Sequence, residues 1–230
     1  IYQIFKGEDF KDDKAVNLIM TRLKNHQNNQ GLWSWWNKKE DTAHWMSAQV
    51  IRAFAMANNE GYKVDINLDR IIRYYFEKDD SPANINEKID ILQAISEWGK
   101  NKKLADIAYK IEKENNKLPI QQQLKLWEVI AQNGGTIDSE RLKANLIESD
   151  KGGMFVSSDG SSWRNSSLLN TLAAYRVARH IPEMQKEVQS MIYYVLSSRK
   201  GSWNTYESAQ VVSAMLKDMT DKKQANVQAM

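Results

Sequence analysis

The sequence predicts an all-α fold, and two observations lead to that expectation. The chain has 230 residues with 3 prolines and 10 glycines, so long stretches contain no residue that breaks a helix. Within these stretches apolar residues recur with the 3.6-residue period of a helix, and none alternates over a useful length as a strand does. We therefore expect helices throughout, with strands limited to a short pair at a turn.

One group of segments has a single apolar stripe on an otherwise charged helix. Such a pattern is typical of an outer helix that keeps one side in water. The stripes are formed by Val16, Ile19, Met20 and Leu23; by Leu68, Ile71, Ile72, Tyr75 and Phe76; by Leu104, Ile107, Ala108 and Ile111; and by Val188, Met191, Ile192, Val195 and Leu196.

A second group is apolar or small on most sides, which predicts buried inner helices. Residues 89–98 and 124–130 are less extreme members of this group. The clearest members are Ala43, Trp45, Met46, Ala48, Val50, Ile51, Ala53 and Phe54; Leu168, Leu169, Leu172, Ala173, Ala174 and Tyr175; and Ala209, Val211, Val212, Ala214 and Met215. The inner helices are expected to begin near Thr42, Asn86, Ile120, Arg164 and Thr205.

Outer and inner segments alternate at roughly 40 residues per hairpin, within the range of helical-hairpin repeats. About five such hairpins form either an open solenoid or a closed ring, an α/α toroid with the inner helices as its barrel. We predict the toroid, because an open array would leave the nearly apolar inner helices partly exposed to solvent. No linker of Pro, Gly or Ser divides the chain, so residues 1–230 are predicted to be a single domain. The start at Ile1, without a signal-peptide pattern, predicts a fragment of a larger multidomain protein.

A glycine followed two residues later by an aromatic residue precedes inner helices at both ends of the chain. The two copies are Gly31-Leu32-Trp33 and Gly201-Ser202-Trp203, and Gly153-Met154-Phe155 is a weaker third copy with phenylalanine in place of tryptophan. Glycine permits a positive φ or close backbone packing, and the aromatic ring covers the apolar end of a helical layer. This repetition supports the helical-repeat interpretation.

Charge and composition exclude several classes of function. The net charge of +3 comes from 32 basic and 29 acidic residues interspersed along the chain, so no nucleic-acid partner is expected. The chain has 0 cysteines, which excludes a disulfide, a thiolate metal site and a cysteine nucleophile. No apolar run approaches the roughly 20 residues that a membrane span needs.

Residues 14–62, which contain AVNLIMTRLKNHQNNQGLWSWWNKKEDTAHWMSAQVIRAFAMANNEGY, resemble the thioester-containing domain of the α2-macroglobulin and complement family. The shared features are an outer helix, a polar loop, a glycine-aromatic turn and a Thr-Ala start to an inner helix that ends in Ala-x-x-x-Gly-Tyr. The later segments SSWRNSSLLNTLAAYRVARH and GSWNTYESAQVVSAMLK are similar to the family as well. The resemblance covers nearly the whole chain in the order of its elements.

This resemblance implies a non-catalytic helical domain of a bacterial α2-macroglobulin-like protease inhibitor. It implies neighbouring β-sandwich domains and a target protease as partners, and a periplasmic, cell-envelope or secreted location. The family's thioester forms within a Cys-x-Glu-Gln sequence, and this chain has no cysteine and no Glu-Gln pair. The motif therefore lies at or before Ile1, or this protein has lost it.

The alternative function is an α/α-toroid enzyme that acts on polysaccharide or isoprenoid substrates. A glycosidase needs two carboxylates across a cleft, and the candidates on inner segments are Glu87, Asp90, Glu97, Glu128 and Glu207. Capping boxes explain several of these acids equally well, since Asn204 precedes Glu207, and Asn84 or Asn86 precedes Glu87. The acidic pairs Asp12-Asp13 and Asp79-Asp80 are interpreted as helix caps and a turn. No catalytic residue and no cofactor is assigned.

The histidines do not predict a metal site. His26, His44 and His180 are scattered over a loop, an inner-helix start and a helix end, without a second ligand at suitable spacing. His44 is interpreted as hydrogen-bonded at a helix start, where the helix dipole lowers the pKa of its imidazole.

Tryptophans gather at the starts of the inner helices, which in a ring puts them on one rim. They either plug the end of the barrel or form a surface that contacts a sugar or a protein partner. Trp35 and Trp36 are adjacent and point in different directions, so one of them is the best candidate for a contact residue. The full candidate set is Trp33, Trp35, Trp36, Trp45, Trp163 and Trp203.

Overall fold

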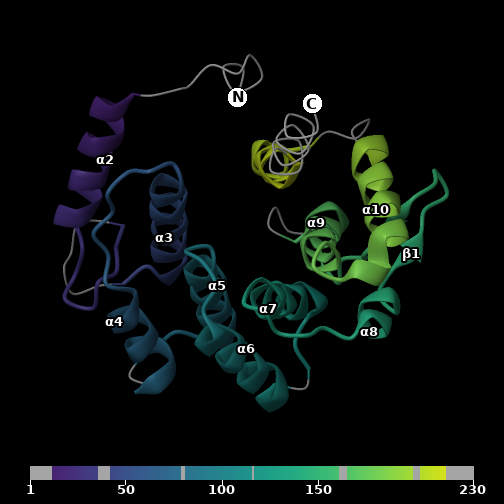
Figure 1. Ribbon diagram of the computed structural model, residues 1–230, viewed down its shortest axis with the longest axis horizontal. Coiled ribbons are helices and arrows are strands. Elements are labelled where there is room, and N and C mark those ends of the chain that lie inside the picture. Colours follow the sequence, from purple (N-terminus) through teal and green to yellow (C-terminus); the bar gives the residue numbers. More distant parts are fainter. Residues whose placement is uncertain are drawn as a thin grey trace, which may run out of the picture. The chain divides into compact units, whose positions relative to one another are not determined.

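The computed structural model describes residues 12–35, 42–78, 81–115, 117–160, 165–198 and 203–215. These residues form helices joined by loops, together with one small two-stranded sheet (Figure 1). The predicted all-α class is confirmed. The chain divides into two compact units, Ile1–Gly99 and Lys100–Met230. The single domain and the closed ring stay predictions.

The first unit contains the helices α2 (Asp13–Asn25), α3 (His44–Asn59), α4 (Leu68–Ile72) and α5 (Ile85–Ser96). A π-helix, η1 (Arg73–Glu77), follows α4 without a break. α3 and α5 lie side by side and supply most of the core of this unit, whereas α2 has no buried residue. The apolar stripe predicted for α2 is not buried, and its Ile19 is 55% exposed, whereas α4 buries Ile71 and Ile72 of its stripe.

The second unit is built on two neighbouring inner helices. α7 packs against both α6 and α9, and α9 packs in turn against α10. α9 is buried on nearly all sides, as predicted, whereas α6 and α10 each bury one stripe. Its elements are α6 (Lys102–Glu114), α7 (Ile120–Gln132), α8 (Ser139–Lys143), β1 (Ile147–Glu148), β2 (Met154–Phe155), α9 (Ser167–Ala178), the 3₁₀ turn η2 (Pro182–Met184), α10 (Gln185–Ser197) and a helical segment at 205–215.

The last helical segment corrects two burial predictions. Ala209 is exposed and Val212 is partly exposed, whereas Val211 and Ala214 are buried. Apolar residues occur on more than one face of this short segment, at Tyr206, Ala209, Val211, Val212, Ala214 and Met215, so its sequence permits more than one rotation about the helix axis. The pair spaced by three residues faces the core, because residues i and i+3 share a helix face.

Polar residues begin several helices as predicted. Asp12 caps α2 by accepting a hydrogen bond from the Ala15 N–H at 3.0 Å. Asn84 and Glu87 form a complete capping box at the start of α5. Asn204 and Glu207 do the same before the last segment, with the Glu207 N–H donating to Asn204 Oδ1 at 2.8 Å and the Asn204 N–H donating to Glu207 Oε2 at 3.1 Å. The acidic pair at 79–80 lies outside the described residues.

The strands form a short antiparallel hairpin, in which Ile147 pairs with Phe155. Its turn contains Gly153, which has a φ of +83°. A Cβ atom at this position would lie 2.7 Å from both the Ser190 carbonyl oxygen and the Tyr194 nitrogen of α10. The glycine thus allows the hairpin to touch the helix backbone, and the Phe155 ring stacks on Tyr194 with 4.9 Å between ring centroids.

Candidate functional site

Trp33 belongs to the core of the first unit. Its side chain is 2% exposed, and its Nε1–H donates to the Leu23 carbonyl at 2.7 Å. The edge of the ring meets Phe54, with 5.6 Å between centroids. The preceding Gly31 has a φ of +84°, so the glycine-aromatic turn uses the left-handed conformation that its sequence predicts. Trp33 therefore anchors the loop and offers no surface to a partner.

Trp35 is the exposed member of the tryptophan set, with 61% of its surface accessible. Its ring is stacked on Trp45, with 5.5 Å between centroids and 22° between planes. Trp45 lies in the first turn of α3 and is partly buried. Trp203 is partly buried, and Trp36 and Trp163 lie outside the described residues. Among the described members, Trp35 is thus the one whose ring is mostly available for contact.

His44 begins α3 and forms a hydrogen bond with the neighbouring π-helix. Its Nδ1 lies 2.6 Å from the Tyr75 hydroxyl oxygen, and the two rings meet edge to face. Burial lowers the pKa of the His44 imidazole below its ordinary value, while the Glu87 carboxylate acts in the opposite direction. Burial also raises the pKa of the Tyr75 phenol. A neutral imidazole paired with a neutral phenol is therefore the stable state near pH 7.

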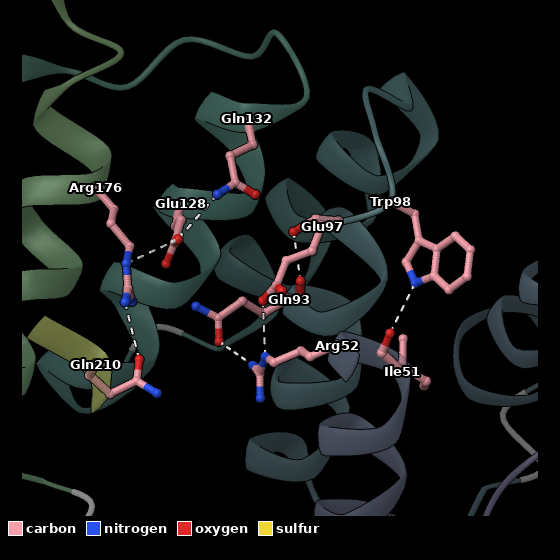
Figure 2. A network of polar contacts seen from close by, with 10 residues as sticks. Ile51, Arg52, Gln93, Glu97, Trp98, Glu128, Gln132, Arg176 and Gln210 are labelled. Carbon is pink, nitrogen blue, oxygen red and sulfur yellow. Dashed lines mark hydrogen bonds and ion pairs between the residues drawn. The ribbon is translucent and has the colours of Figure 1, made fainter. Parts of the chain in front are cut away.

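The carboxylate of Glu97 is held by an arginine on the adjacent helix. Arg52 of α3 donates from Nε to Glu97 Oε1 at 3.0 Å and from Nη2 to Gln93 Oε1 at 2.7 Å (Figure 2). A further hydrogen bond, from Trp98 Nε1–H to the Ile51 carbonyl at 3.2 Å, also joins the segment after α5 to the middle of α3. We call Arg52, Gln93 and Glu97 the first clamp.

The second unit repeats this arrangement with different residues. Arg176 of α9 lies between Glu128 of α7, at 4.0 Å from Nε to Oε1, and Gln210, to which its Nη2 donates at 3.1 Å (Figure 2). Glu128 also accepts from Gln132 Nε2 at 3.1 Å. We call Arg176, Glu128, Gln132 and Gln210 the second clamp. Each clamp joins inner helices within its own unit.

Two of the remaining candidate carboxylates, Glu87 and Glu207, take part in capping boxes at helix starts. Glu87 Oε2 accepts from the Asn84 N–H at 2.9 Å, and Glu207 Oε1 accepts from the Ser166 hydroxyl at 2.7 Å. Asp90 lies on α5 and is partly buried. Glu87, Glu97, Glu128 and Glu207 thus each hold a local structure together. None of these four contacts resembles a pair of acids facing each other across a cleft, which glycoside hydrolysis uses.

The three histidines lie apart in the fold. His26 caps the end of α2, His44 begins α3, and His180 follows α9 in an exposed turn. Within the described ranges, no group of three or more His, Asp or Glu side chains is placed to hold a metal ion. No described helix is long and apolar enough to cross a membrane.

The two clamps were not predicted from the sequence, although the sequence contains a feature that indicates them. Arg176 is the one charged residue in α9, and Arg52 is the one Arg, Lys, Asp or Glu in α3. A lone arginine on an otherwise uncharged inner helix needs an acceptor on a neighbour, since a buried charge is costly unless it is paired. The contacts of Trp127 were not predicted from the sequence either. Its Nε1–H donates to Glu112 Oε1 at 2.7 Å, and Arg141 lies 5.0 Å from the centre of its ring.

Comparison with protein families, curated proteins and solved structures finds no match for this chain. The functional argument therefore depends on the residues themselves.

Proposed function

We propose that this chain is the non-catalytic helical domain of a bacterial α2-macroglobulin-like protease inhibitor. The observation that carries the proposal is the use of the inner-helix acids. Glu97 and Glu128 belong to clamps, and Glu87 and Glu207 belong to capping boxes. Side chains that an enzyme of this architecture would direct at a substrate are used here to cap helices or to join them. This favours a scaffold over the polysaccharide or isoprenoid enzyme.

The arrangement that we propose is an α/α toroid of about five hairpins, with inner helices α3, α5, α7, α9 and the segment 205–215. Alternating inner and outer helices within each unit support this arrangement. So does the glycine-aromatic turn at Gly31, after which Trp33 is buried against Phe54 of α3. In the parent protein, β-sandwich domains would flank this domain and a protease would be its target, in the periplasm, the cell envelope or outside the cell.

The chain alone is expected to be chemically inert. A thioester acylates amines because a thiolate is its leaving group, and this chain has 0 cysteines to supply one. Incubation with methylamine should therefore produce no mass change and no released thiol. The same preparation should not hydrolyse polysaccharides or ionise isoprenoid diphosphates.

The deciding experiment uses the full parent protein and a panel of endopeptidases. We expect the parent to reduce cleavage of a protein substrate, and an otherwise identical parent that lacks residues 1–230 to lose this effect. Turnover of a polysaccharide by the chain alone, abolished by Glu87→Gln or Asp90→Asn with the helical circular dichroism unchanged, would refute the proposal in favour of the enzyme.

A further inference from the structure

We propose that the His44–Tyr75 hydrogen bond is an acid-sensitive latch that fastens the beginning of α3 to the π-helix η1. The proposal concerns the first unit alone and does not depend on the proposed function. Its basis is the way in which the first turn of α3 is held. The N-cap residue of α3 is Ala43, which has no side chain able to cap the helix. The free N–H groups at a helix start normally gain such a partner, so this helix start relies on contacts with other elements.

Those contacts come from two directions. On one side, the Trp33 N–H donates to Ser47 Oγ at 2.9 Å and the Ala43 N–H donates to the Trp33 carbonyl at 2.8 Å. On the other side, the His44 ring is bonded to Tyr75. Tyr75 is 1% exposed and sits in the middle of η1. The wider turn of a π-helix changes which way a side chain points, and such turns are often found at functional positions.

The latch is closed when the imidazole of His44 is neutral. In the neutral tautomer that carries its proton on Nε2, the Nδ1 of His44 accepts a hydrogen bond from the Tyr75 O–H, which satisfies a buried donor. In a protonated imidazole Nδ1 also carries a proton and donates to the Tyr75 oxygen, so the buried Tyr75 O–H loses this acceptor. Among the described residues no other acceptor is hydrogen-bonded to that hydroxyl. A buried hydroxyl without a partner costs free energy, and the change therefore weakens the connection between α3 and η1.

The surroundings also act on the charged imidazole. Burial disfavours it and lowers the pKa of His44. The positive end of the α3 dipole disfavours a cation at this first position as well. Glu87 on α5 favours the cation, but its Oε2 already accepts from the Asn84 N–H in the capping box. The other titratable neighbour, Tyr74 on η1, acts on Tyr75 and helps to keep that phenol neutral.

The sign of the pH dependence follows from these shifts. The pKa of His44 in the folded chain lies below the ordinary 6.5, so the contribution of the latch is complete above that value. It is lost as the pH falls from 6.5 towards the lowered pKa. Within this interval the opening equilibrium of the latch should change by about tenfold per pH unit, because one additional proton is bound on opening.

The test is amide hydrogen exchange of the full chain, read at the Ser47 N–H, which donates to the Ala43 carbonyl at 2.9 Å in the first turn of α3. Exchange is measured from about pH 8 to about pH 4.5 and corrected for the intrinsic chemical rate, while the His44 ring is titrated by NMR. We expect protection of Ser47 to fall as His44 becomes protonated. His26→Gln, a change at an exposed histidine outside the latch, should leave the profile as in the wild type.

The conservative variant Tyr75→Phe keeps the ring contact and removes the hydroxyl. It should lower Ser47 protection at pH 8, flatten its pH dependence, and move the pKa of His44 part of the way back towards the ordinary value. Three results would overturn the latch: Ser47 protection that stays constant while His44 titrates, protection that rises on acidification through a Glu87 ion pair, or a His44 that stays neutral until the whole chain unfolds.

Discussion

A matched pair of leucine truncations tests the division into inner and outer helices. Leu172 lies on α9 and is 1% exposed, whereas Leu196 lies on α10 and is 56% exposed. Both belong to the second unit, and the same chemical change, Leu→Ala, is made at each. Alanine has the higher helix propensity, so any cost comes from lost packing and not from the backbone.

The expected loss of stability for Leu172→Ala follows from the position of α9. This helix packs against α7 on one side and α10 on the other, so the surrounding side chains have little freedom to close a cavity. Leu172→Ala should therefore reduce the free energy of unfolding by about 3 kcal/mol, within the range found for fully buried leucines. Leu196→Ala should cost less than about 0.5 kcal/mol, as is usual for a surface change.

Urea unfolding followed by far-UV circular dichroism measures both values. The denaturation slope of each variant should match that of the wild type, which ensures that a change in midpoint reports a change in stability. Thermal unfolding gives a second estimate, for which about 3 kcal/mol corresponds to a decrease in Tm of about 10 °C in a chain of this size. Equal midpoints for the two variants would show that α9 and α10 do not differ in burial as described.

Two further predictions concern the clamp and the hairpin. A double-mutant cycle with Arg52→Leu and Glu97→Gln, measured by urea unfolding, should give a coupling free energy of about 1 kcal/mol, because the ion pair is partly buried and its arginine also contacts a third side chain. A coupling free energy near zero would show that this ion pair does not stabilise the fold. Gly153→Ala should reduce the free energy of unfolding by more than about 2 kcal/mol, because both the positive φ and the nearby α10 backbone disfavour a Cβ atom. Gly61 also has a positive φ, but a Cβ atom there would meet nothing within 4 Å, so Gly61→Ala should reduce it by about 1 kcal/mol. Thermal unfolding compares the two variants, and equal losses of stability would argue against a close contact between Gly153 and the α10 backbone.

Helical periodicity was sufficient to predict most of the fold. Four predicted inner-helix starts, near Thr42, Asn86, Ile120 and Thr205, lie within two residues of the observed starts at His44, Ile85, Ile120 and Thr205. A stripe that extends over several turns determines which face is buried, because each turn repeats the same choice. The same logic explains the error at Val212, where a short segment with apolar residues at most positions does not select one rotation.

The π-helix shows a different limit of sequence reasoning. The stripe through Leu68, Ile71, Ile72, Tyr75 and Phe76 correctly predicted an apolar face, and Ile71, Ile72 and Tyr75 are buried. The widened turn over Arg73–Glu77 does not change which residues are apolar, so periodicity does not reveal it. Periodicity also does not reveal that the Tyr75 hydroxyl lies 2.6 Å from His44 Nδ1, because the two residues are 31 positions apart. The latch was therefore not visible in the sequence, although His44 itself was recognised at a helix start.

The polar residues of the inner helices explain why acids in such helices are poor indicators of catalysis. A helix that is buried on most sides cannot place a charge in water, so each charge must find a partner on a neighbouring helix. Arg176 has Glu128 on α7 and Gln210 on the last helical segment, and Arg52 has Gln93 on α5 and Glu97 at its C-terminal cap. Such pairs add directional contacts to an apolar interface whose hydrophobic packing has no fixed direction. Searching for the arginine that belongs to each buried acid therefore separates a structural carboxylate from one left free to act on a substrate.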